Sequence, residues 1–163
     1  MTSKIIIRVV ILIILAVLAI VFLKPKQDEV TPKLPAGSTP PIDISLVADK
    51  EWVWEKTVLS TGSTTAPKVP GKFTITLASD TQVSGTTDCN NFSGIYMVGT
   101  EGILTFGPFA MTKMYCEGSQ EAEFTGELAK VQSFTLTDGN LSLMLEGGEG
   151  TMIFTKIEKM ETI

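Results

Sequence analysis

The chain has 163 residues, 13 basic and 18 acidic, with a formal charge of −5 at neutral pH and no histidine. The lack of histidine excludes catalytic triads and dyads built on imidazole. Beyond Lys26, nine basic residues stand against 18 acidic ones, a formal charge of −9. A domain of this charge without a basic stripe lacks the phosphate attraction that dominates nucleic-acid affinity, so we expect no nucleic-acid partner.

Residues 1–23 predict an N-terminal transmembrane anchor. Residues 9–23 are uncharged and almost wholly aliphatic, and residues 5–7 extend the run beyond Arg8. The 19 residues from Ile5 to Leu23 are long enough to cross about 30 Å of hydrocarbon, with Arg8 near enough to one end to reach the headgroups. Basic residues lie on both flanks, so charge does not decide the orientation. The short N-terminal flank favours an uncleaved signal anchor, with the following domain facing the periplasm or cell exterior.

A cleaved signal peptide is the alternative, because Val17-Leu18-Ala19 offers small residues for cleavage. The apolar run continues past that point through Leu23, which favours the retained anchor. Residues 24–45 follow as a linker that holds five of the eight prolines. Proline favours extended backbone near 3 Å per residue, so this linker can hold a domain away from the bilayer.

Residues 46–163 predict a single domain composed mostly of strands. Apolar side chains alternate with polar ones at residues 73–77 and 141–145, the pattern of half-buried strands. Asp138-Gly139 and Gly147-Gly148 suit tight hairpin turns, and so the last third predicts a three-stranded antiparallel meander. Trp52 and Trp54 lie on one face of a first strand, where they either enter the core or form a sugar-stacking platform.

One segment has helical periodicity. Phe124, Leu128 and Val131 recur at i, i+4 and i+7 behind Ser119, which can act as the N-cap. Gly126 within this segment costs about 1 kcal/mol relative to alanine, which indicates either close packing on the sheet or a weak helix.

The two cysteines, Cys89 and Cys116, lie in a part of the chain that reads as extracytoplasmic, where thiols are oxidised. This favours a disulfide over a metal site or a nucleophile. Asp88, Glu117 and Glu121 flank the cysteines and leave open a carboxylate acid/base pair. Exposed carboxylates are the ordinary alternative, and we expect neither a metal nor another cofactor.

A longer pattern runs through the sequence. It consists of Trp52 and Trp54, residues 85–96, residues 104–108, residues 112–116, a Glu121 to Leu128 helix and the closing strands. This pattern resembles the META domain of the HslJ-like family, over about residues 46–157. The resemblance implies a small, mostly antiparallel β domain with one helix, often behind a signal peptide or lipoprotein anchor. Family members are associated with envelope stress, drug tolerance or motility, without an established enzymatic reaction. The lipid-acceptor cysteine of the lipoprotein form is missing here.

The motif contains residues with structural and with candidate binding roles. Structural roles fall to Gly85, Phe92, Gly94 and Met114; Gly94 permits a bend or close backbone approach that a Cβ would block. The candidate ligand-binding residues are Asn90, Asn91, Tyr96 and Thr112, which would converge on a pocket for a polar ligand. The alternative is that these side chains satisfy neighbouring backbone groups.

We therefore predict a mainly β (α+β) fold: a single small domain with an antiparallel, partly barrel-like sheet and one packed α-helix, preceded by one transmembrane helix. The predicted function is a non-catalytic binding or structural module that supports envelope stress tolerance. Its partners are the membrane, through the N-terminal helix, and an unidentified envelope protein, peptide or small ligand. A carboxylate-dependent enzyme acting on an envelope polymer is the alternative.

Overall fold

The computed structural model describes residues 43–157, and the predicted anchor (1–23) and nearly all of the predicted linker (24–45) lie outside this range. Among the described residues, no helix has both the length and the apolar character needed to span a bilayer. The 3-10 turns are η1 Ile44–Leu46, η2 Thr100–Gly102 and η3 Glu146–Gly148, and the α-helix is α2 Glu121–Leu128. The strands are β1 Glu51–Leu59, β2 Thr64–Thr65, β3 Thr74–Leu77, β4 Gln82–Thr86, β5 Asn91–Val98, β6 Leu104–Phe106, β7 Ala110–Met111, β8 Val131–Thr137, β9 Asn140–Leu145 and β10 Gly150–Lys156.

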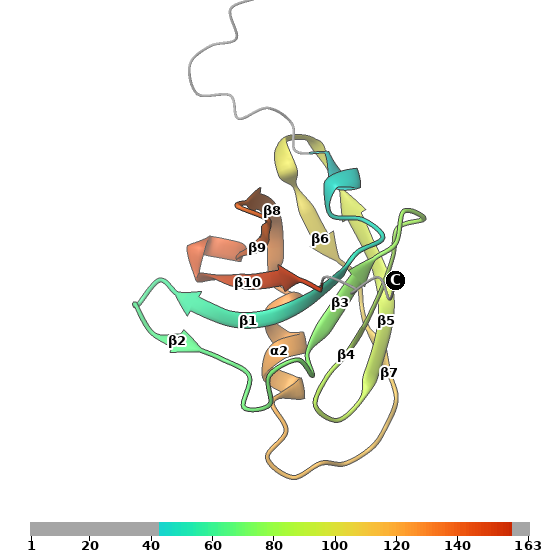
Figure 1. Ribbon diagram of the computed structural model, residues 1–163, viewed down its shortest axis with the longest axis vertical. Helices are drawn as coiled ribbons and strands as arrows, with labels where there is room; N and C mark the ends of the chain where they lie inside the picture. Colours follow the sequence, from blue (N-terminus) through green and yellow to red (C-terminus); the bar gives the residue numbers. More distant parts are fainter. Residues whose placement is uncertain (1–42, 158–163) are drawn as a thin grey trace, which may run out of the picture. The chain divides into compact units, whose positions relative to one another are not determined.

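The strands form one antiparallel sheet in the order β6-β5-β4-β3-β1-β10-β9-β8, with β2 beside β1 and β7 beside β5 (Figure 1). A single bridge between Ile103, next to β6, and Ser133, in β8, links the two ends of this order. The sheet is therefore a nearly closed barrel, which confirms the predicted mainly β class with an antiparallel, barrel-like sheet.

The predicted meander is present as β8, β9 and β10. Leu141, Leu143 and Leu145 of β9 are buried, as their alternation with Ser142 and Met144 predicts. Asp138 and Gly139 both have positive φ, at 52° and 79°, the backbone that a two-residue hairpin turn requires.

Helix α2 has the predicted bounds, but two details of its prediction were wrong. Val131 is not on the helix, because the chain turns after Leu128 and Val131 begins β8. The N-cap is Gln120 rather than Ser119, although the Ser119 hydroxyl still accepts a hydrogen bond from the backbone N–H of Glu121 at 3.0 Å. An apolar residue seven positions after Phe124 fits either a longer helix or the start of the next strand. Periodicity alone therefore did not locate the end of the helix.

Phe124 of α2 lies at the centre of the core. Its ring is 5.3 Å from Trp54, 5.1 Å from Phe73, and 6.2 Å from both Phe92 and Phe154, measured between centroids. These contacts join the helix to side chains from β1, β5 and β10 and from the segment before β3. Both Trp52 and Trp54 are buried, so they belong to the core and are not available as a sugar-stacking platform.

A polar chain runs from the core to the helix surface. The indole N–H of Trp54 donates to Thr57 Oγ1 at 3.1 Å, and the Thr57 hydroxyl donates to Glu127 Oε2 at 2.6 Å. Burial raises the pKa of Glu127 above its ordinary value, as does the charge of Glu123, whereas the Thr57 hydrogen bond and Lys130 act in the opposite direction.

Replacing Gly126 with alanine should stabilise the domain by about 0.5 to 1 kcal/mol. A Cβ at Gly126 would have no heavy atom within 4 Å, so the substitution removes backbone entropy of the unfolded chain without a clash. Urea denaturation measures the effect. Gly118→Ala is the matched control: its Cβ would be equally free, but φ at Gly118 is +73°, and this variant should lose stability.

Glu127→Gln should raise the free energy of unfolding near pH 7. A raised folded-state pKa means that the native state keeps its proton to higher pH than the unfolded state, so stability falls as pH rises through that pKa. Glutamine keeps an acceptor for Thr57 but carries no charge. The gain over wild type should shrink as pH falls and Glu127 becomes protonated. Urea midpoints measured across acidic to neutral pH check this, with the exposed Glu117→Gln as a control that should change little; an unchanged gain at low pH would contradict it.

Candidate functional site

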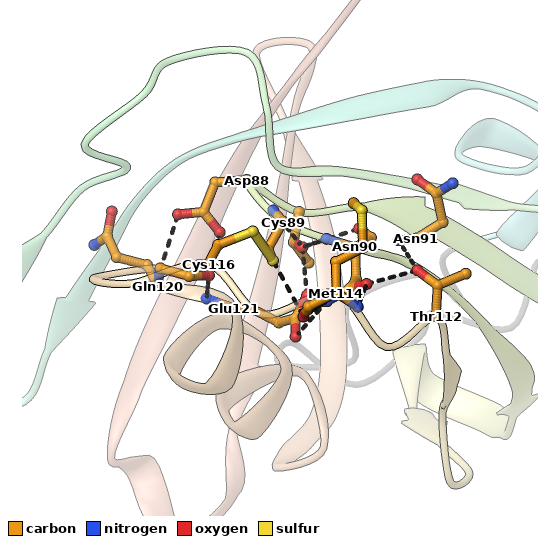
Figure 2. Close-up of a disulfide and its surroundings, with 11 residues drawn as sticks. Asp88, Cys89, Asn90, Asn91, Thr112, Met114, Cys116, Gln120 and Glu121 are labelled. Carbon is orange, nitrogen blue, oxygen red and sulfur yellow. Dashed lines mark hydrogen bonds between the residues drawn. A yellow bond between two sulfur atoms is a disulfide. The ribbon is translucent and has the colours of Figure 1, made fainter.

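The disulfide between Cys89 and Cys116 is present and joins the start of the Asn90 segment to the loop that enters α2 (Figure 2). The Cα atoms are 5.8 Å apart and the residues are separated by 27 positions. Closing a loop of this length stabilises the fold by about 3 to 4 kcal/mol in the chain-entropy model. Both thiols are used, and residues 43–157 contain no cluster of three metal-ligating side chains.

Asn90 is buried beside this disulfide, and its side chain uses its whole hydrogen-bonding capacity. Its Nδ2 donates to the Met114 carbonyl oxygen at 3.0 Å and to Glu121 Oε1 at 3.2 Å. Its Oδ1 accepts from the Thr112 hydroxyl at 2.7 Å and from the Met114 backbone N–H at 2.8 Å. One amide therefore fixes the Thr112–Met114 segment and connects it to the first residue of α2 (Figure 2).

The side chain of Thr87 makes further hydrogen bonds within the same turn. Its hydroxyl accepts the backbone N–H groups of Asn90 at 2.8 Å and Cys89 at 3.2 Å. The hydroxyl can donate one hydrogen bond and has two acceptors in reach, the Asn90 carbonyl oxygen at 2.9 Å and Glu121 Oε2 at 2.7 Å. The carboxylate is the stronger acceptor of the two. Both carboxylate oxygens of Glu121 are therefore engaged by side chains of the Thr87–Asn90 turn.

Asp88 holds the start of the helix from the other side. Its Oδ1 accepts from the Ser119 hydroxyl at 2.5 Å and its Oδ2 from the Gln120 backbone N–H at 3.0 Å. The side chain of Gln120, itself buried, then binds the loop before β3: it accepts from the Lys68 N–H at 2.6 Å and donates to the Ala66 carbonyl at 3.2 Å. A negatively charged carboxylate at a helix N-terminus also interacts favourably with the positive end of the helix dipole.

The four candidate ligand-binding residues are not all brought together. Asn90 and Thr112 are hydrogen bonded to each other, and the Asn91 backbone pairs with Thr112 while its side chain is exposed. Tyr96 points into the barrel, where its hydroxyl donates to the Ala78 carbonyl at 2.6 Å, and burial raises its pKa. Asn91 and Thr112 border an open groove of about 300 Å³, which Phe92, Ser93, Ala110 and Met111 also line.

The four motif residues with expected structural roles have tight surroundings or fixed backbones. A Cβ at Gly85 would lie 2.1 Å from the Thr74 carbonyl oxygen, and one at Gly94 would lie 3.1 Å from the Pro108 carbonyl oxygen. Phe92 is buried with its ring 5.1 Å from Phe109. Met114 is held by its backbone through Asn90, while its side chain faces solvent.

The loop between β7 and α2, residues 112–118, exposes two large side chains. Met114 is 64% exposed and Tyr115 is 92% exposed. Sequence reasoning assigned Tyr115 no role. The signal in the sequence was its position between Met114 of the motif and Cys116. A loop residue next to a disulfide has restricted backbone freedom, so its side chain is held in place. We call residues 112–118 the disulfide loop.

Comparison with known proteins gives one family and several solved structures of similar fold. The family model described as the META domain matches residues 45–159. An NMR structure of a protein from Burkholderia xenovorans is similar, with 23% identity, a TM-score of 0.60, and coverage of 78% of this chain and 97% of that one. A crystal structure of a DUF4847 family protein from Bacteroides vulgatus has 16% identity and a TM-score of 0.55, covering 71% and 98%. At these identities the likeness is one of fold. No curated protein sequence matches.

Asn90→Asp should destabilise the domain by about 2 to 4 kcal/mol at neutral pH. The variant loses both Nδ2 hydrogen bonds and places a second carboxylate beside Glu121. Part of the loss should be recovered on acidification, when one carboxylate takes up a proton. Urea denaturation at several pH values measures both effects.

Asn91→Asp is the matched control, because Asn91 is adjacent in sequence and its side chain is exposed. It should change stability by no more than about 0.5 kcal/mol. Equal losses in the two variants would show that the Asn90 hydrogen bonds contribute nothing specific.

Proposed function

We propose that this chain, which belongs to the META domain family, is a non-catalytic binding module that is held at the membrane by its N-terminal segment and faces away from the cytoplasm. Its task in this proposal is to support envelope stress tolerance by binding an envelope protein or peptide. The binding surface is the disulfide loop.

The observation that carries this proposal is the contrast between a fixed backbone and exposed side chains. The backbone of Met114 makes two hydrogen bonds with buried Asn90, and Cys116 is covalently joined to Cys89. The side chains of Met114 and Tyr115 nevertheless point to solvent. A loop that is already ordered loses little entropy on binding, and exposed aromatic residues on such loops are typical binding hot spots.

The carboxylates near the cysteines support binding over turnover. Asp88 and Glu121 each accept two hydrogen bonds that hold the helix start and the Thr87–Asn90 turn. Their oxygens are used by the fold, and a proton-transfer role would have to break those bonds. Glu117 is exposed on the disulfide loop. The matched family and the similar structures are not named for any reaction.

The disulfide supports the proposed location. Disulfides persist in oxidising compartments such as the periplasm or the cell surface and are rare in the cytosol. The apolar run at residues 5–23 is the proposed means of attachment.

The double variant Met114→Ser/Tyr115→Ser in the full chain should abolish complementation of a deletion strain under envelope stress, while leaving the melting temperature within a few degrees. The two side chains are exposed, so the fold does not need them. The matched control is Leu46→Ser/Val69→Ser, which removes two exposed aliphatic side chains elsewhere, at 49% and 46% exposure. This control should complement fully.

A photoreactive residue at position 115 in living cells supplies the binding readout. It should give a discrete adduct that the same residue at position 69 does not give. Complementation by the loop variant, or identical adducts at the two positions, would overturn the proposal.

A further inference from the structure

A hollow that is separate from the disulfide loop lies beside the middle of β1. Strand β3 pairs with β1 at residues 51–53 and β2 pairs with it at residues 57–58, and within residues 43–157 no strand pairs with this side of β1 at Glu55 or Lys56. The chain between β2 and β3 passes below β1 in Figure 1. Together they border an open hollow of about 440 Å³, within the range of about 300 to 1,000 Å³ that is usual for small-molecule sites.

A bulge in β1 places two opposite charges on the same face of the sheet. The register between β1 and β10 shifts between Trp54 and Lys56, so Glu55 is the extra residue. Trp54 before the bulge and Thr57 after it are buried, whereas Glu55 and Lys56 between them are exposed. In a regular strand two adjacent side chains point to opposite faces, and here the bulge turns both outward. Both side chains line the hollow.

The fold makes no use of these two charges. Within residues 43–157, neither the Glu55 carboxylate nor the Lys56 ammonium has an ion pair or a hydrogen bond, with each other or with any other group. No other charged side chain lines the hollow. Lys68, on the chain between β2 and β3, donates its ammonium to the Gly118 carbonyl oxygen at 3.0 Å. The two charges of the bulge are therefore available to a ligand.

The rest of the lining is mainly apolar, and part of it is held in place. Pro67 and Pro70 contribute from the chain between β2 and β3, and Val53 contributes from β1. The buried side chain of Gln120 forms hydrogen bonds with the backbone on both sides of Pro67, at 2.6 and 3.2 Å. The proline ring also fixes φ. This wall is thus ordered before a ligand arrives, which lowers the entropy cost of binding.

We propose that this hollow binds a free α-amino acid with an aliphatic side chain. Such a molecule carries an ammonium and a carboxylate on one carbon atom, which complements opposite charges on adjacent residues: Glu55 takes the ammonium and Lys56 takes the carboxylate. The aliphatic side chain lies against Val53 and the two proline rings, where it is removed from water. This inference does not depend on the binding role of the disulfide loop.

The test is an NMR titration of the full chain in detergent micelles with L-leucine, in which the backbone amide signals of residues 53–56 should shift and saturate. N-acetylleucine lacks the ammonium and leucinamide lacks the carboxylate. Each should bind about three- to fivefold more weakly, the upper range for an exposed charge pair. Glycine has both charges but no side chain, and it should also bind more weakly. The absence of saturable shifts at these residues, or equal affinities for leucine and glycine, would overturn the proposal.

Two variants assign each charge to its partner. Glu55→Gln should weaken leucine binding by a similar factor but should not weaken N-acetylleucine binding, because that ligand has no ammonium. Lys56→Gln should weaken leucine binding but not leucinamide binding. Glu51→Gln is the matched control, since Glu51 is on the same face of β1 but outside the hollow, and it should leave all these affinities unchanged. Equal weakening of leucine and N-acetylleucine by Glu55→Gln would show that Glu55 does not hold the ammonium, and the proposed site would be wrong.

Discussion

The hydrogen bonds of the buried Asn90 amide connect the parts of this structure that have least regular backbone. The amide joins the start of β5, the disulfide loop and the first residue of α2. Helix α2 in turn places Phe124 against four aromatic rings of the core. The order of the exposed loop and the packing of the core thus depend on the same junction, because a buried amide that loses one partner leaves other groups unsatisfied.

Local patterns were sufficient to predict a large part of this architecture. Alternation predicted the buried leucines of β9, Asp138-Gly139 predicted a hairpin, and two cysteines in a segment read as extracytoplasmic predicted their bond. The unpredicted features are long-range. Barrel closure depends on one bridge between Ile103 and Ser133. The link from Gln120 to the loop before β3 joins residues more than 50 positions apart, and no local periodicity encodes such a pair.

The acidic side chains show why composition alone misjudges a site. In the sequence, Asp88 and Glu121 have polar neighbours and look like solvated carboxylates. In the structure they lie where α2 begins. Asp88 accepts from the Ser119 hydroxyl and the Gln120 backbone N–H, and Glu121 accepts from the Thr87 hydroxyl and the Asn90 side-chain amide. Four N–H groups at a helix start have no partner within the helix, so acceptors supplied by a distant segment both cap the helix and fasten that segment to it. Through these hydrogen bonds the two carboxylates connect the Thr87–Asn90 turn to the start of α2.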